Sequence, residues 1–296
     1  MLQEVVDEYI ASLTSKESGR RGTNQNTIVA YRNDLHQLCT YLGQQALENW
    51  CQVTREHIAG YLLEMREGLA YRPTTIARKL AALKSFFRYM QSTGIVAINP
   101  VEKLEAPRIQ KELPHVLSAE QIGCLFRQVE VETLHGQRDL AMLHMLYATG
   151  MRVTELVSLN LDNLDVVHAT VICPGRNGRN SRERVLPLSP VAFEATKHYL
   201  EAARPRMIAR HPEEQALFVN HHGERLTRQG FWLIVKTYAR QAGITTITPH
   251  MLRHSFAILM LNGGMELRSV QELLGHAHIS TTQVYSQLAR SKTTTV

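Results

Sequence analysis

The chain has 296 residues, of which 44% are hydrophobic and 20% are charged, and its formal net charge is +6. This length predicts about two domains, and the composition excludes a disordered or fibrous protein. The sequence has no apolar run long enough to cross a membrane. Its 4 cysteines are widely separated and form no CxxC pair. We therefore expect neither a disulfide framework nor a structural zinc site, and the cytosol is the predicted compartment.

Positive charge gives the first indication of function. The isoelectric point is about 9.2, most of the excess basic residues follow residue 107, and arginine far outnumbers lysine there. Arginine has the geometry for bidentate contact with phosphate. The charge has two interpretations: a protein that binds nucleic acid, or a basic protein without a charged partner. Net charge alone does not distinguish them, because only basic residues clustered on one surface indicate nucleic-acid binding.

Helices are predicted throughout residues 1–104. One follows a polar start at Thr23 to Asn26, and a second runs from Arg72 to Gly94, with Pro73 as its start signal. The apolar stripe of this second helix comprises Ile76, Leu80, Leu83, Phe87 and Met90. Three basic residues fall outside the stripe: Arg78, Lys84 and Arg88. They form either the solvated face of a helical bundle or a face that contacts DNA phosphates.

A linker is predicted at residues 105–116, where the sequence contains two prolines and no apolar periodicity. Ser118 and Gln121 then have the spacing of a capping box. A helix is predicted to end at Gly150, and a short helix follows it directly. Two β-rich segments, 166–173 and 183–188, flank an arginine-rich turn and predict a small antiparallel hairpin. Helices are predicted from there to the C-terminus.

Four patterns are candidates for chemistry. They are TGMRVTEL, which contains Arg152 and Glu155, the turn PGRNGRNSR, the segment TPHMLRHSF, and LLGH with Tyr285 nine residues later. Each also has an ordinary interpretation. Arg152 and Glu155 are three residues apart and could form a surface ion pair. Tyr285 could be a core aromatic residue.

The histidines have ordinary interpretations as well. His250 and His254 have the i, i+4 spacing of metal ligands on a helix, but Met251 stands where the zinc-protease pattern has glutamate. No metal is therefore expected there. His276 could be the first residue of a helix with no functional role.

Taken together, two arginines, two histidines and a tyrosine have the functional groups needed to attack a phosphodiester. Guanidinium groups neutralise the charge that builds on the non-bridging oxygens. A phenol has a pKa of about 10, so it needs a base or nearby cations to become a nucleophile. Histidine moves protons near neutral pH. The sequence has no evident carboxylate cluster for Mg²⁺, so no cofactor is expected.

This order of residues resembles the tyrosine recombinase, or phage integrase, family, and most closely its Xer subgroup. The similarity covers nearly the whole chain. TIVAYRNDLHQLCTYL and INPVEKLEAPR resemble the N-terminal DNA-binding domain, and TPHMLRHSFA and VQELLGHAHISTTQVY resemble the C-terminal signature. The resemblance implies a mainly α fold with a small antiparallel β-sheet. A helical-bundle DNA-binding domain is expected at 1–104 and an α+β catalytic domain at 117–296.

The resemblance also implies a role for each matching residue. Arg152 and Arg253 would hold the scissile phosphate, and His276 would contact it. His250 would be an acid–base partner. Tyr285 would attack, which gives a 3′-phosphotyrosine and a free 5′-hydroxyl. The covalent intermediate conserves the energy of the broken bond, so rejoining needs no ATP.

The implied partner is double-stranded DNA, bound by a homo- or hetero-tetramer on two sites that exchanges strands through a Holliday junction. Glu155 would support the site. A nucleoid-associated cytoplasmic protein is implied, without a membrane partner. The role would be chromosome-dimer resolution or integration and excision of a mobile element, and a paralogue or regulatory protein as further partner stays open. The alternatives are a catalytically weak DNA-binding protein of the same fold and a relaxing topoisomerase of related chemistry.

The sequence departs from the family pattern at Arg179, which stands where the family has a catalytic lysine. That lysine is expected to protonate the leaving 5′-oxygen. Arginine is a poor acid, although Arg179 could still neutralise the oxygen. A slower enzyme, another acid such as His250 or a water, and an altered chain all stay open.

Basic residues in the turn and on the second helix are predicted to contact DNA: Arg176, Arg182, Arg184, Arg78, Lys84 and Arg88. A solvated basic loop is the alternative for the turn. The second departure is the short tail after Tyr285, because SKTTTV is a poor helix former. This argues against the exchange of C-terminal segments between protomers that the family resemblance otherwise implies.

Overall fold

The computed structural model describes residues 2–14, 25–107, 115–175 and 183–293. The chain divides into two compact units, Met1–Lys111 and Glu112–Val296. Each unit has a hydrophobic core of its own. They are called the N-terminal unit and the C-terminal unit below. Most of the predicted linker, residues 108–114, lies outside the described residues.

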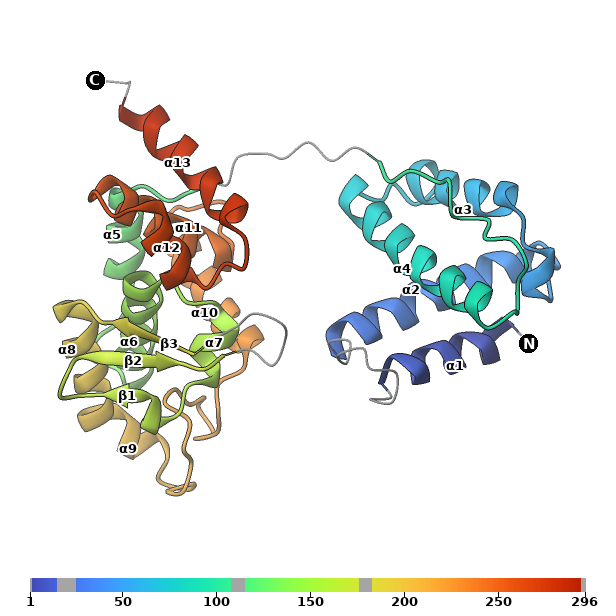
Figure 1. Ribbon diagram of the computed structural model, residues 1–296. Helices are drawn as coiled ribbons and strands as arrows, with labels where there is room; N and C mark the ends of the chain where they lie inside the picture. The colour runs from blue at the N-terminus through green and yellow to red at the C-terminus, as the bar shows by residue number, and fades with distance from the viewer. Residues whose placement is uncertain (1, 15–24, 108–114, 176–182, 294–296) are drawn as a thin grey trace. The chain divides into compact units, whose positions relative to one another are not determined.

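The described part of the N-terminal unit is helical (Figure 1). A single 3₁₀ turn at Trp50–Gln52 lies between its second and third α-helices. The helices are α1 (Leu2–Thr14), α2 (Gln25–Gln44), α3 (Arg55–Glu67) and α4 (Pro73–Ser92). The prediction of a helical domain in this region is confirmed.

Helix α4 confirms the predicted start and stop signals. Pro73 is the first helical residue, where its missing N–H costs no hydrogen bond. Gly94 follows the helix with φ of 75°, a left-handed conformation that glycine adopts without steric cost. All members of the predicted apolar stripe are buried. Phe86 completes the core through ring contacts with Trp50 and Tyr9, at centroid distances of 4.9 and 5.2 Å.

The C-terminal unit combines helices with one small sheet (Figure 1). A π-helical turn, Tyr199–Ala203, joins its α8 and α9. The helices are α5 (Ala119–Arg127), α6 (Leu134–Thr149), α7 (Val153–Ser158), α8 (Pro190–His198), α9 (Arg204–Met207), α10 (Arg228–Gln241), α11 (Pro249–Asn262), α12 (Leu267–Leu274) and α13 (Ile279–Thr293). The capping box predicted from Ser118 and Gln121 is present, with reciprocal hydrogen bonds of 3.0 and 3.1 Å.

The predicted hairpin is correct but incomplete. Strands β2 (Thr170–Cys173) and β3 (Arg184–Pro187) pair antiparallel, with Cys173 opposite Arg184. A third strand, β1 (Leu164–Asp165), pairs with β2 and gives the order β1-β2-β3. Two residues are too few to show the alternating pattern by which a strand is recognised in sequence, so the hairpin prediction missed this edge strand.

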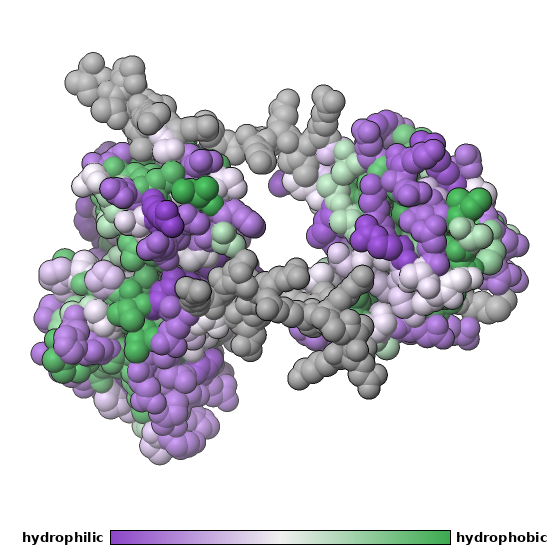
Figure 2. Space-filling view, viewed as in Figure 1, coloured by the Kyte–Doolittle hydropathy of each residue, from purple (hydrophilic) through white to green (hydrophobic). Residues whose placement is uncertain are grey.

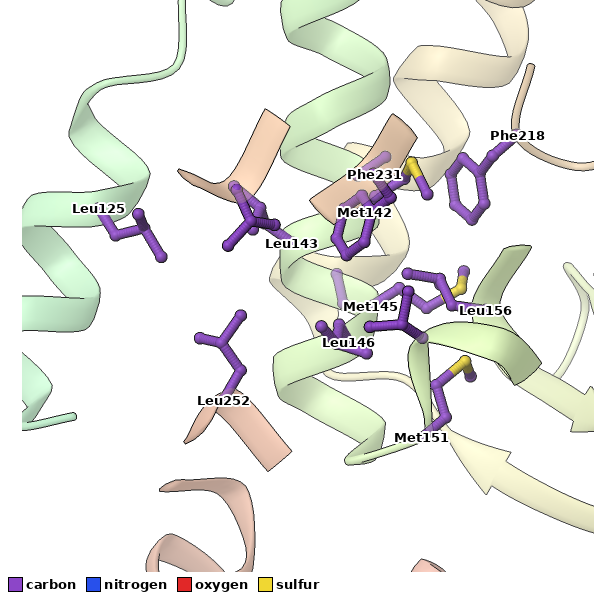
Figure 3. Packing of buried hydrophobic residues seen from close by; sticks show 14 of the residues in the cluster. Leu125, Met142, Leu143, Met145, Leu146, Met151, Leu156, Phe218, Phe231 and Leu252 are labelled. Atoms are coloured by element: carbon purple, nitrogen blue, oxygen red, sulfur yellow. The ribbon is translucent and has the colours of Figure 1, made fainter. Parts of the chain in front are cut away.

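Helix α6 is the centre of the C-terminal core. It packs against α8, α11, α7 and β3, and its side chains are buried around most of its circumference. Figure 3 shows Met142, Met145 and Leu146 of α6 facing Phe231 of α10 and Leu252 of α11. Close packing on all sides restrains α6, so the residues that directly follow its C-terminus are held in a fixed position.

The prediction that SKTTTV is a poor helix is wrong for its first part, because α13 continues to Thr293. Helix α13 is anchored further upstream. Thr282 and Tyr285 are buried. Tyr285 belongs to a hydrophobic cluster with residues of α11 and α12, and Leu288 packs against that cluster. Extending a formed helix needs far less favourable sequence than nucleating one, so tertiary packing overrides the weak propensity of these residues.

Hydrophilic residues dominate the visible surface of both units, and hydrophobic residues occur there in small groups (Figure 2). Across the described ranges of the chain, no helix combines the length and the apolar character that spanning a bilayer requires.

Candidate active site

The turn between α6 and α7 positions Arg152 and Glu155. Gly150 ends α6 in the left-handed conformation, with φ of 60°, and the Phe256 ring fills the space that a side chain there would need. Arg152 is the N-cap of α7. Its backbone N–H donates to Oε2 of Glu155 at 2.7 Å, and its Nη1 donates to Oε1 at 2.8 Å. The ion pair therefore forms, but it is no surface pair, because Glu155 is buried.

Arg253 of α11 joins three segments of the chain. Its Nη1 donates to the carbonyl of Gly150 at 2.6 Å, and its Nη2 donates to the carbonyl of Leu274 at 2.5 Å. The residue is only 3% exposed. Burial, together with the neighbouring charge of Arg152, lowers the pKa of Arg253 to about 10, so the guanidinium stays charged at neutral pH.

A third guanidinium belongs to this cluster. Arg184, at the start of β3, donates from Nη2 to Oε2 of Glu155 at 3.0 Å and to Sγ of Cys173 at 3.2 Å. Its side chain is 9% exposed, and its Nε and Nη1 are buried without a hydrogen-bond partner. For Arg184, the interpretation as part of a solvated basic loop is wrong. Contact with DNA stays a prediction for this residue.

Glu155 carries its charge between these arginines. Burial by itself would raise the pKa of Glu155. The hydrogen bond from the Arg152 backbone and the charges of Arg184 and Arg152 outweigh that effect and hold the pKa below its ordinary value. The carboxylate is therefore ionised, and it fixes Arg152 and Arg184 beside each other.

Tyr285 of α13 lies at the edge of this cluster. It is 3% exposed and packs with Phe256, Val270 and Leu274. Its hydroxyl lies 2.7 Å from Nδ1 of His254 on α11. Burial raises the pKa of the phenol, while the charges of Arg253 and Arg152 oppose that rise.

Three histidines surround Tyr285 and its neighbours. The ring centroids of His254 and His276 lie 5.3 and 6.2 Å from that of Tyr285, and the His250 ring lies 6.0 Å from the His254 ring. His276 pairs through Nδ1 with the Thr282 hydroxyl at 2.9 Å. Burial and the charges around Arg253 lower the pKa of His254 to about 4 and that of His276 to about 3, and they lower that of His250. His254 and His276 are therefore neutral at neutral pH.

The structure thus brings together Arg152, Glu155, Arg253, His276 and Tyr285, which the sequence had placed in separate motifs. Exposed His250 lies one helical turn from His254. Three residues of the basic turn, Arg176, Arg179 and Arg182, lie outside the described residues. Within the part of the chain that the structure describes, no group of three or more His, Cys, Asp or Glu side chains is placed to hold a metal ion.

His254 is the residue that the sequence analysis missed as part of the site. In the sequence, His254 stands out only as the second member of a histidine pair with the spacing of metal ligands. A signal was present, because positions 250, 253 and 254 of one helix lie on the same face. That spacing does not reveal the partner, since Tyr285 is 31 residues away in the chain.

The basic residues of α4 were predicted to contact DNA, and two of them are exposed, Arg78 and Arg88. Lys84 is half-buried. Arg78 is also an ion-pair partner of the buried carboxylate of Asp34. Lys79, which the sequence analysis did not single out, is buried and donates to the same carboxylate at 2.8 Å.

Comparison with known proteins agrees with this arrangement. A model of the phage integrase family matches residues 115–292, and one of the phage integrase N-terminal SAM-like domain matches residues 6–94. The chain belongs to the phage integrase family. The chain is 46% identical over 290 residues to tyrosine recombinase XerC of Roseiflexus sp. (strain RS-1), and the match covers 97% of this chain and 90% of the relative. It is 40% identical over 292 residues to tyrosine recombinase XerD of Listeria innocua, with coverage of 98% and 95%.

Solved structures share the fold of this chain. The XerH recombinase bound to palindromic difH substrate aligns with a TM-score of 0.74 at 20% identity, over 99% of this chain and 94% of that one. A lambda integrase dimer bound to a COC′ core site aligns with a TM-score of 0.74 at 17% identity, over 96% and 94%. The predicted family, the predicted fold class and the prediction of a tyrosine recombinase are confirmed.

Proposed function

We propose that this protein cleaves and rejoins DNA at a specific site, with Tyr285 as the nucleophile and a 3′-phosphotyrosine as the intermediate. One observation carries the proposal. Arg152 and Arg253 both donate to carbonyls of the Leu274–Gly275 turn, at 3.4 and 2.5 Å. That turn leads directly to His276, whose ring lies beside Tyr285.

Each group has a role in this reaction. Arg152 and Arg253 neutralise the two non-bridging oxygens of the scissile phosphate as charge builds on them, and His276 donates a hydrogen bond to the same phosphate. Glu155 supports the site by holding Arg152. His250, exposed at the start of α11, acts as an acid–base partner near the leaving 5′-oxygen. Arg179 in the basic turn replaces the usual lysine and neutralises that oxygen as it leaves.

The proposed substrate is double-stranded DNA. The XerH and lambda integrase structures are complexes with substrate or core-site DNA, and this chain has their fold. The N-terminal domain, 1–104, contacts the duplex through Arg78, Lys84 and Arg88. The catalytic domain, 117–296, contacts it through Arg176, Arg182 and Arg184, and the linker at 105–116 joins the two. Salt-dependent binding is expected from phosphate contacts of this kind.

A tetramer of identical or paralogous chains on two DNA sites would exchange strands through a Holliday junction. The reaction needs no ATP, because the phosphotyrosine bond conserves the energy of the cleaved one, and the arginines would supply the positive charge at the phosphate. The protein would act on the nucleoid in the cytoplasm, either to resolve chromosome dimers or to integrate and excise a mobile element.

A covalent-trapping assay tests the proposal. The full chain is incubated with nicked genomic fragments, and DNA-linked protein is detected on a denaturing gel. Wild type should form an adduct, Tyr285→Phe should form none, and sequencing the trapped DNA gives the site. An adduct only with Arg179→Lys would show that the natural residue impairs cleavage. DNA binding without an adduct from any version would favour a catalytically weak DNA-binding protein.

A further inference from the structure

The hydroxyl of Tyr285 lies within hydrogen-bond distance of a ring nitrogen that, in the tautomer protonated at Nε2, can accept its proton. Nδ1 of His254 lies 2.7 Å from it, a short distance for a hydrogen bond between a hydroxyl and a ring nitrogen. Helices α11 and α13, which carry the two residues, pack directly against each other. Within the described parts of the chain, the Tyr285 hydroxyl has no second hydrogen-bond partner, and the residue is 3% exposed. Water therefore has little access to the phenolic proton.

The two other histidines near Tyr285 are less well placed to take that proton. Nδ1 of His276 faces the Thr282 hydroxyl at 2.9 Å. His250 is exposed, and its ring centroid lies 6.0 Å from that of His254. In the described structure, neither is hydrogen-bonded to the phenol.

We propose that His254 is a further catalytic residue, the general base that takes the phenolic proton of Tyr285 during cleavage. The inference rests on the proposed function of Tyr285 as nucleophile. As the phenol oxygen bonds to phosphorus, its proton moves to Nδ1 of His254. The bond from phosphorus to the 5′-oxygen breaks, and that oxygen takes a proton from a water or from His250 and becomes a 5′-hydroxyl. In rejoining, the 5′-hydroxyl returns that proton to the same group and attacks phosphorus, and His254 returns its proton to the departing phenol oxygen.

The surroundings of His254 keep it in the form that this role requires. The ionisable groups facing it are His250 and Arg253 on its own helix, Tyr285 on α13, and His276 after α12. Burial and its positive neighbours lower the pKa of His254 to about 4, so the ring is unprotonated at neutral pH and accepts a proton. A phosphodiester bound at Arg253 brings negative charge, which stabilises the imidazolium formed in the transition state.

The test measures the rate of adduct formation on a synthetic nicked duplex that carries the cleavage site recovered by trapping. His254→Gln removes the base, and His144→Gln serves as a matched control. His144 is a half-buried histidine of α6 that packs against Phe126, and burial is the only cause of its lowered pKa, with no contribution from the charged groups of the site. Each protein is assayed with the natural 5′-oxygen and with a 5′-bridging sulfur. Sulfur leaves without protonation, so this substrate is insensitive to loss of an acid but still needs a deprotonated nucleophile.

We expect His254→Gln to slow adduct formation by about 100-fold or more on both substrates, and His144→Gln to match wild type. His254→Ala should be equally slow and should recover with added imidazole, a recovery that a merely structural role would not produce. A wild-type rate in His254→Gln, a defect that disappears with the sulfur substrate, or no recovery with imidazole would overturn the assignment. If wild type forms no adduct, the proposed nucleophile fails; if wild type and His254→Gln form it equally fast, only this inference fails.

Discussion

The Arg184 guanidinium occupies the space beside Gly275 in which the first side-chain atom of any other residue would lie. Gly275 adopts a φ of 62° at the end of α12, and its carbonyl accepts a hydrogen bond from Arg152. The absence of a side chain at this position lets a guanidinium from β3 pack beneath the turn that leads to His276. The sheet and the C-terminal helices are thereby joined at the candidate active site.

Gly275→Ala should destabilise the C-terminal unit for two reasons. Alanine is strained at positive φ by about 1 kcal/mol, and its methyl group would displace Arg184 from Glu155. Gly243→Ala is the matched control, because Gly243 has a φ of 71° but open space around it. Urea denaturation should show a clearly larger loss of unfolding free energy for Gly275→Ala. Equal losses in the two variants would contradict the packing argument.

Arg184→Met should lower the unfolding free energy by about 3 kcal/mol, because it deprives the buried carboxylate of Glu155 of one of its two cationic partners. Residues that share one ion-pair network are not energetically independent. Glu155→Gln should therefore cost less in the Arg184→Met background than in wild type. A double-mutant cycle by denaturation measures this coupling, and strictly additive losses would show that Arg184 and Glu155 do not interact.

The N-terminal unit offers a matched pair of cations on one carboxylate. Asp34 is buried, the Lys79 side chain is 7% exposed, and the Arg78 side chain is 47% exposed. Lys79→Met should lower the unfolding free energy by about 3 kcal/mol, because the buried carboxylate of Asp34 loses its buried partner. Arg78→Met should lower it by less than about 1 kcal/mol.

Trp50 fluorescence in a Trp232→Phe background would report unfolding of the N-terminal unit in the full chain, since Trp50 belongs to its core. Equal losses of unfolding free energy for Lys79→Met and Arg78→Met would show that the difference in burial does not determine how much each cation stabilises the unit. In a filter-binding assay, Arg78→Met should also weaken DNA binding and reduce its salt dependence, because it removes an exposed cation.

Stability of the C-terminal unit should fall with pH below about 6.5. The pKa of His254 is lowered to about 4 and that of His276 to about 3, so the unfolded chain takes up protons before the folded one does. The two neutral histidines contribute their full stabilisation above the pKa that histidine has in the unfolded chain. This stabilisation is lost as the pH falls toward the pKa values of the folded protein. At pH 5 the loss is at most about 2 kcal/mol for each histidine, because solvent screening and the coupling between the two rings reduce it.

Thermal unfolding at pH 7 and pH 5 measures this effect. His276→Asn should lose less Tm between the two pH values than wild type does, because one of the two linked groups is removed. An identical pH dependence in wild type and variant would show that His276 does not titrate in this way.

Local signals along the chain were sufficient for much of the fold. Pro73 and Gly94 mark the two ends of helix α4, Ser118 caps α5, and Gly150 ends α6. These signals could be recognised because each helix end depends on backbone conformations that neighbouring residues determine. Edge strand β1 and the end of α13 were missed. A two-residue strand exists only because β2 pairs with it, and the last turn of α13 forms because Tyr285 and Leu288 pack upstream.

The order of motifs in the sequence also determined the family and the identities of the chemical groups, because short segments carry them intact. It did not determine which groups touch. Arg184 was expected on a basic loop and is buried against Glu155, and His254 was not assigned to the site although it holds the Tyr285 hydroxyl. These contacts join residues 29 and 31 positions apart. Only the packing of β3, α11 and α13 decides them, because hydrogen-bond partners across such distances depend on tertiary structure and not on spacing along one helix or strand.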